Sequence, residues 1–181
     1  MRPMKVSKVD AASRQPDTAI SLWFRDDDPV SIHTLAFAAY EIAQKLSQKL
    51  GNLRMTLEGW VPERVKPESV QAVIQRITEA RNFFKHADRD PYGILDFDPS
   101  VTEYVLVLCV VCLANLRVER SDWQSTLVLW HFLHRPELFL PGANPFPKAF
   151  GPDQIAELGR MHKPAFAQFA LNWFAQHVAR R

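Results

Sequence analysis

The chain has 181 residues, 47% of them hydrophobic and 23% charged, and its formal net charge is +2. These values are typical of a globular protein with a hydrophobic core, and the small net charge means that any nucleic-acid-binding patch must be local. The first 25 residues lack the apolar run of a secretory signal, and the most apolar stretch, residues 104–116, is too short to span a bilayer. Because the chain also has only two cysteines, we expect a cytoplasmic protein with no membrane association.

Two helices are expected in the first 50 residues. Residues 18–25 suit a short helix, and Pro16 is expected to limit its extension toward the N-terminus. Asp28–Pro29 is a typical helix opening, so a second helix is predicted over 29–50, ending at Gly51. Its core stripe is Ile32, Leu35, Ala36, Ala39, Ala43, Leu46 and Leu50.

The predicted helix over 29–50 has a second stripe, formed by His33, Phe37, Tyr40 and Gln44. This stripe is either a half-buried face with its polar tips in water, or a surface that contacts a partner or a functional site.

The middle of the chain is expected to contain a short strand and one more long helix. The loose alternation of residues 55–61 suggests the strand. Pro67 and Glu68 open the helix, which should end before Asp90–Pro91 and Gly93. Its apolar stripe is Val70, Val73, Ile77, Ala80 and Phe84.

The last third is predicted to be helical on both sides of a proline-rich loop. Asp98–Pro99 opens a central helix over 101–118, and Ser121 begins a helix that runs to about His134. Five prolines exclude regular structure over 136–152, and a last pair of short helices follows, the final one over about 164–178. We therefore predict a single all-α domain, 1–181, with about six helices: a bundle, the Pro-rich loop 136–152 and a C-terminal helical appendage, 153–181.

Three groups of reactive residue types have structural explanations. Cys109 and Cys112 lie in mid-helix among apolar residues, which indicates core packing rather than redox chemistry. The Asp26–Asp28 cluster near His33 is better explained by helix capping than by metal binding. His131 and His134 share a helix face without a metal-binding motif around them. We predict no metal site and no cofactor.

The segment Arg81–His86 is the best candidate for a functional site. Asn82 and His86 are i,i+4 neighbours on the face opposite the core, and Arg81 can reach the same side. Arginine binds phosphate bidentately and histidine transfers protons near neutral pH, so the pair suits phosphodiester cleavage. The alternative is a polar helix end in which Lys85 and His86 interact with the helix dipole.

The pattern Arg81-Asn82-x-x-x-His86 resembles the Arg-x4–6-His motif of the HEPN superfamily. Members are all-α bundles that usually dimerise, and many are metal-independent endoribonucleases. The resemblance implies catalytic roles for Arg81 and His86, a supporting role for Asn82, and a composite site at a dimer interface. This chain differs from the pattern in continuing for 95 residues beyond His86.

Two functions remain open at this point. One is a HEPN-like ribonuclease or a degenerate relative that binds RNA or a nucleotide, with Lys85, His33 and Tyr40 contacting the substrate and His33 near His86. The other is a non-catalytic helical protein that binds a partner or a small ligand through the His33/Phe37/Tyr40 stripe. In both cases the second stripe and an outward Phe83 predict a homodimer.

Overall fold

The computed structural model describes residues 3–51, 56–63, 66–86, 88–135 and 150–177. Over these residues the chain is helical and contains no strand, which confirms the all-α class. The elements are α1 (Lys8–Phe24), α2 (Pro29–Lys49), α3 (Leu57–Trp60), the 3-10 turn η1 (Pro67–Ser69), α4 (Val70–Lys85), α5 (Val101–Asn115), α6 (Asp122–His134), α7 (Pro152–Leu158) and α8 (Lys163–His177).

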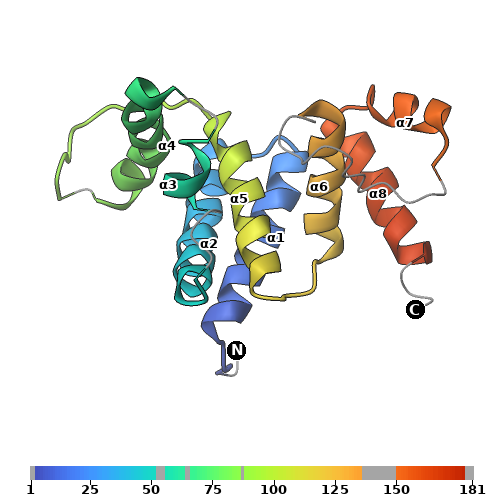
Figure 1. Cartoon of the computed structure of the whole chain (residues 1–181), viewed down its shortest axis with the longest axis horizontal. Helices are drawn as coiled ribbons and strands as arrows, with labels where there is room; N and C mark the ends of the chain where they lie inside the picture. The colour runs from blue at the N-terminus through green and yellow to red at the C-terminus, as the bar shows by residue number, and fades with distance from the viewer. Residues whose placement is uncertain (1–2, 52–55, 64–65, 87, 136–149, 178–181) are drawn as a thin grey trace.

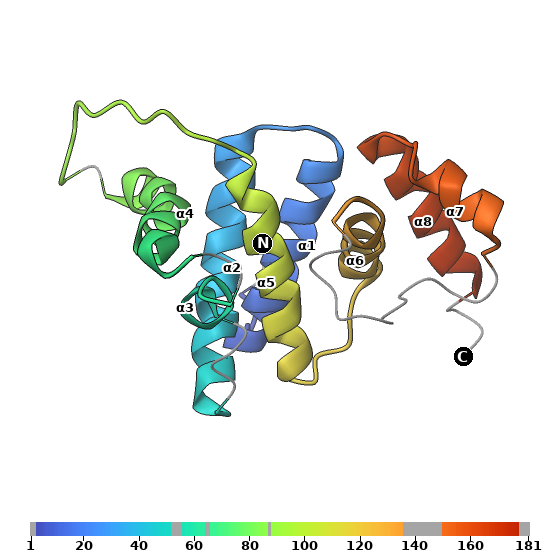
Figure 2. The ribbon, with the colours of Figure 1, turned by 45° about the horizontal axis from the view of Figure 1, so that its top comes forward.

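Helices α1, α2 and α5 form the centre of the molecule (Figure 1). The most extensive contacts are those of α2 with α1 and with α5. Helix α4 packs against α2 on one side of this centre, and α6 followed by α8 lies on the other side (Figure 2). No helix among the described residues has both the length and the apolar character needed to cross a bilayer.

Aromatic side chains join the centre to the C-terminal helices. The ring of Phe24 in α1 lies 5.8 Å from that of Trp130 in α6 and 6.2 Å from that of Phe166 in α8. Phe24 and Phe166 are almost completely buried. Helix α8 therefore contributes side chains to the same core as α1 and α6.

The helix opening predicted at Asp28–Pro29 is confirmed. The Asp28 carboxylate accepts hydrogen bonds from the backbone N–H groups of Val30 and Ser31, and α2 runs from Pro29 to Lys49. Ser121 caps α6 in the same way, by accepting a bond from the N–H of Gln124. The side chain of Gln124 does not complete a capping box but donates to Asp17.

Two sequence predictions for the first half are wrong. Pro16 does not limit α1, which starts at Lys8 behind a capping box formed by Ser7 and Asp10. A proline inside a helix costs about 3 kcal/mol, and here the buried face that α1 presents to α2, α5 and α6 offsets that cost. The strand predicted over 55–61 is also wrong, because Thr56 caps the one-turn helix α3 instead.

The two cysteines pack in the core as predicted. Cys109 and Cys112 are buried thiols on α5. Burial raises the pKa of Cys112 to about 12 and that of Cys109 well above its ordinary value. Neither thiol is a nucleophile at neutral pH. The Pro-rich stretch predicted to form a loop lies, over 136–149, outside the described residues.

Candidate functional site

The predicted motif occupies the last turns of α4, where this helix packs on α2. Nη1 of Arg81 donates to Oε1 of Glu41 on α2 over 3.0 Å. Nε and Nη2 of Arg81 both donate to Oδ1 of Asn82, over 3.1 and 2.9 Å. The guanidinium also lies 5.7 Å from the centre of the Phe37 ring. Arg81 is thus held by a carboxylate, an amide and an aromatic ring.

Glu41 is the centre of this arrangement, because Lys85 uses its other oxygen. Nζ of Lys85 lies 2.7 Å from Oε2 of Glu41. His86 is the residue that ends α4, its side chain is 41% exposed, and its Nδ1 lies 3.9 Å from Oδ1 of Asp88. The structure therefore brings Arg81, Asn82 and Lys85 together around Glu41 and places His86 at the exposed end of the helix.

His33 lies near α4 but inside the protein. Its ring is 5.8 Å from that of Phe84 and 5.0 Å from that of Phe97, and its Nδ1 is 2.8 Å from Oγ1 of Thr102 on α5. The side chain is fully buried, and its Nε2 has no hydrogen-bond partner among the described residues. Burial lowers the pKa of His33 to about 4, so the ring is neutral at pH 7.

Tyr40 is also buried, and its hydroxyl accepts a hydrogen bond from the backbone N–H of Leu57 over 2.8 Å. This bond fixes α3 on α2. Burial raises the pKa of Tyr40 above its ordinary value. The stripe His33, Phe37, Tyr40 and Gln44 is therefore covered inside the chain: His33 packs against α4 and α5, and Tyr40 and Gln44 contact the segment that carries α3.

A groove beside the predicted motif has a composition that suits binding. It has a volume of about 440 Å³ and runs along α2 between the start of α1 and the end of α4. Its floor is aliphatic, and four lysines and Glu41 surround it. The floor residues are Ala38, Ile42 and Leu46, and the lysines are Lys8, Lys45, Lys49 and Lys85. We call this feature the lysine groove.

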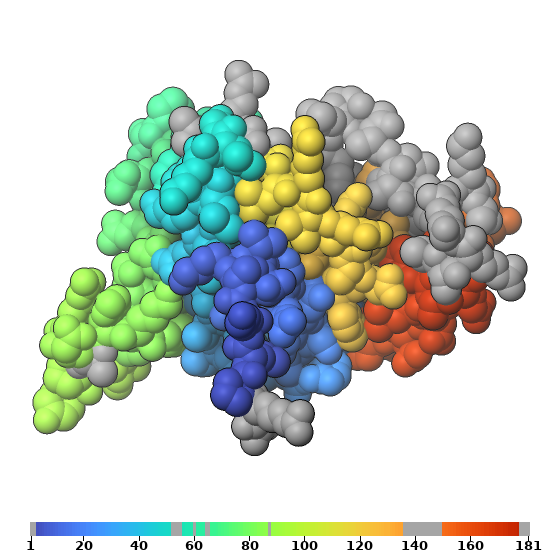
Figure 3. All heavy atoms as spheres, turned by 90° about the horizontal axis from the view of Figure 1, so that it is seen from below, coloured from blue at the N-terminus to red at the C-terminus, as the bar shows by residue number. Residues whose placement is uncertain are grey.

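The space-filling view shows the elements that border the lysine groove (Figure 3). The first residues of α1, drawn in dark blue, lie beside α2, and α4 lies on the other side of α2. Four lysines against one glutamate give the groove a formal charge of +3. The groove is thus an apolar strip with a cationic border, and its end is marked by Lys85 and Glu41 of the predicted motif.

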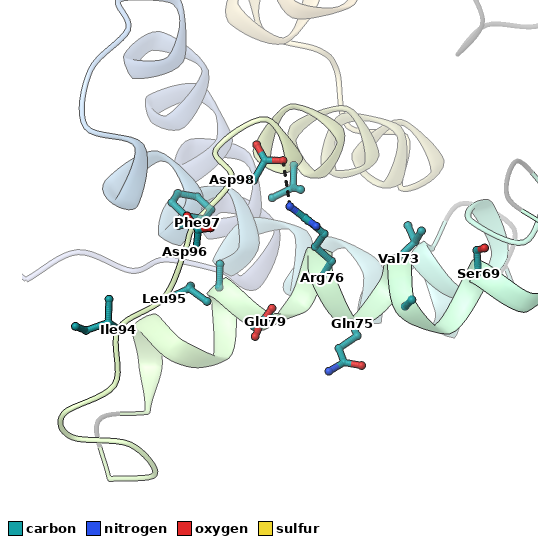
Figure 4. Close-up of a pocket in the computed structure, with 13 residues that line it drawn as sticks. Ser69, Val73, Gln75, Arg76, Glu79, Ile94, Leu95, Asp96, Phe97 and Asp98 are labelled. Carbon is teal, nitrogen blue, oxygen red and sulfur yellow. Dashed lines mark ion pairs between the residues drawn. The ribbon is translucent and has the colours of Figure 1, made fainter.

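A second cavity, of about 690 Å³, lies between α4 and the segment 88–98, which we call the arm (Figure 4). Arg76 on α4 and Asp98 on the arm face each other across it, with Nη2 and Oδ2 4.0 Å apart. The side chains of Arg76 and Asp98 are 71% and 43% exposed, so this pair contributes little to stability. The cavity is an open cleft with scattered polar side chains.

A third cavity, of about 400 Å³, lies where α2, α5 and α8 begin. Glu103 lines it, with Oε1 3.0 Å from Nε2 of the buried His131. Burial alone would raise the pKa of Glu103, but the hydrogen bond and charge of His131, with Arg135 and Lys163, lower it below its ordinary value. Lys163 also lines this cavity, where it pairs with Asp26 and lies over the Trp23 ring.

Sequence reasoning missed the lysine groove. Glu41, Lys45 and Lys49 recur every four residues on α2, which places them on one helix face. Ala38, Ile42 and Leu46 form the adjacent row on the same helix. The signal was therefore present in α2, but Lys8 and Lys85 join it only through the packing of α1 and α4.

No known protein family, curated protein or solved structure matches the chain significantly. Within the described residues, no cluster of three or more His, Cys, Asp or Glu side chains is arranged to hold a metal ion.

Proposed function

We propose that this chain is a helical interaction protein and that the lysine groove binds an acidic, partly apolar segment of a protein. The observation that supports the proposal best is the composition of the groove. Its floor of Ala38, Ile42 and Leu46 offers apolar surface to a partner, and the lysines offer cations at its border. Apolar anchors in the middle and charged pairs at the rim are typical of protein–protein interfaces.

The spacing of the lysines favours a peptide ligand. Lys45 and Lys49 are one helical turn apart, so carboxylates spaced similarly on a bound segment can pair with both. None of the described lining residues is aromatic, so the groove offers no ring on which a nucleobase would stack.

Fluorescence anisotropy tests this proposal. The probe is a fluorescein-labelled helical peptide built from Leu, Ala and Glu, and the control peptide has Lys in place of Glu. We expect the acidic peptide alone to bind, more weakly as salt is added. The double variant K45E/K49E should weaken binding roughly tenfold or more, because both lysines meet the ligand directly.

A charge-matched variant controls for net charge. Arg120 and Arg160 are exposed and lie on other parts of the chain, so R120E/R160E changes the total charge equally. Binding of the acidic peptide to this variant should equal that of the wild type. Equal loss of binding in both variants would show an unspecific charge effect and would contradict the proposal.

The resemblance to the HEPN superfamily supports a second candidate function, RNA binding or cleavage. The observation in its favour is that Arg81, Lys85 and His86 share the last two turns of α4, at the end of the lysine groove. Incubation of labelled single-stranded RNA with and without EDTA tests this candidate. Metal-independent cleavage that is lost in His86→Ala would favour it over the interaction protein.

A further inference from the structure

The arm is built to project from the protein. Phe97 anchors its base, with its ring 5.2 Å from that of Phe84 on α4 and 5.0 Å from that of His33 on α2. From there the chain is extended, and its side chains alternate: Leu95 and Phe97 are half-buried, whereas Ile94 and Asp96 are exposed. In Figure 4 Leu95 lies over α4, and Ile94 points away from it.

A turn at the tip of the arm fixes the position of Tyr92. The N–H of Gly93 donates to the carbonyl of Asp90 over 3.2 Å, with Pro91 in the position that favours such a turn. A Cβ at position 93 would meet the Asp90 carboxylate, whose exposed side chain would have to move aside. A preformed turn loses little conformational entropy when it binds.

The tip carries two large apolar side chains that the described part of the chain leaves exposed. Tyr92 is 94% exposed and Ile94 is 99% exposed. Two large, exposed apolar side chains on one projecting segment indicate a protein–protein contact. The same segment is acidic: four aspartates against one arginine give residues 88–98 a formal charge of −3.

The arm and the lysine groove are complementary in both properties. The groove combines an aliphatic floor with a charge of +3, and the arm combines Tyr92 and Ile94 with a charge of −3. The exposure of the tip shows that the arm does not reach the groove of its own chain. We propose that the groove is occupied by the arm of a second copy of this chain, with Tyr92 and Ile94 on the floor and the arm's aspartates against the lysines.

The exchange is reciprocal. The arm follows directly after α4, and Lys85 at the end of α4 borders the groove, so the two complementary surfaces are neighbours on one molecule. A two-fold axis then places each arm in the partner's groove and leaves no unpaired surface. This inference rests on the proposed function, because it names the occupant of the same groove.

Light scattering after size-exclusion chromatography tests the exchange in the full-length chain. We expect a dimer that dissociates as salt is raised. The variant Y92S/I94S should be monomeric with an unchanged circular dichroism spectrum, since both side chains are exposed. A wild type that stays monomeric at every concentration, or a dimer that Y92S/I94S does not weaken, would overturn the proposal.

A charge exchange identifies the surfaces that meet. K45E/K49E makes the groove acidic and D88K/D96K makes the arm basic, so each variant alone should be monomeric. A mixture should form a heterodimer, because each groove then meets an arm of opposite charge. If both variants are monomeric alone and their mixture forms no heterodimer, the arm and the groove do not contact each other.

The labelled Leu/Ala/Glu peptide separates this inference from the proposed function. If the inference holds, the peptide competes with the arm and converts wild-type dimers to monomers. Binding of the peptide to a wild type that never dimerises would overturn the exchange of arms and leave the groove's proposed function standing. If the wild type neither dimerises nor binds the peptide, the exchange of arms and the proposed function of the groove are both wrong.

Discussion

Acidification should destabilise the protein through His33, whose neutral ring joins α2 to α5. In the folded protein burial lowers its pKa from 6.5 to about 4. Between these values the unfolded chain binds more protons than the folded chain, so stability is lost as the pH falls. At about pH 5 the free energy of unfolding is about 2 kcal/mol lower than at neutral pH, and near pH 4 it is about 3 kcal/mol lower.

Urea denaturation followed by circular dichroism measures this effect at about pH 7 and about pH 5. The informative variant is His33→Gln, whose amide can still bond to Oγ1 of Thr102 but does not titrate. From about pH 7 to about pH 5, the free energy of unfolding should fall by about 2 kcal/mol more in the wild type than in this variant. His162→Gln is the control, because His162 is exposed. Equal pH dependence in wild type and His33→Gln would refute a neutral, buried His33.

Three further predictions concern the core and the end of α4. Phe24→Ala removes a fully buried ring from the aromatic cluster and should cost about 3–5 kcal/mol in chemical denaturation. Glu41→Gln removes the carboxylate shared by Arg81 and Lys85, and it should change the free energy of unfolding by less than about 1 kcal/mol. The variant should bind the acidic peptide more strongly in fluorescence anisotropy. Weaker binding would contradict the proposal that the lysine groove binds acidic segments. His86→Ala should shift the melting temperature by no more than about 2 °C, because the side chain is largely outside the core, and a larger shift in a thermal melt would mark His86 as structural.

Local signals in the sequence were sufficient to predict most of the helices. Asp28–Pro29 and Ser121 cap helices as their sequences indicate, because a cap involves only residues within one turn. Pro16 shows the limit of such signals. Its local cost is real, but α1 is held by burial against other helices, which no local pattern reveals.

The candidate site was predicted only in part. Arg81, Asn82 and Lys85 do lie together, but the carboxylate that holds them comes from Glu41, 40 residues away from Arg81. The sequence predicts that Tyr40 and His33 contact a substrate, but the chain buries both. Helical periodicity predicts which residues share a face, but it does not predict whether that face is covered by the same chain.

The arm also shows that sequence patterns do not predict which side chains the fold leaves exposed. Asp90–Pro91 and Gly93 indicate the end of a helix, and α4 does end before them. The sequence gives no periodicity that would place Phe97 against His33 and thereby leave Tyr92 and Ile94 exposed. This placement depends on tertiary packing between α2 and α4.

We propose that the lysine groove is a binding surface for an acidic, partly apolar segment. Backbone amide chemical shifts of the full-length chain, recorded by NMR during titration with the Leu/Ala/Glu peptide, test it most directly. We expect the changed shifts to belong to the groove: Lys8, residues 38–49 of α2, and Lys85. Changes confined to the cleft between α4 and the arm or to the cavity at Glu103, or no change at all, would contradict it.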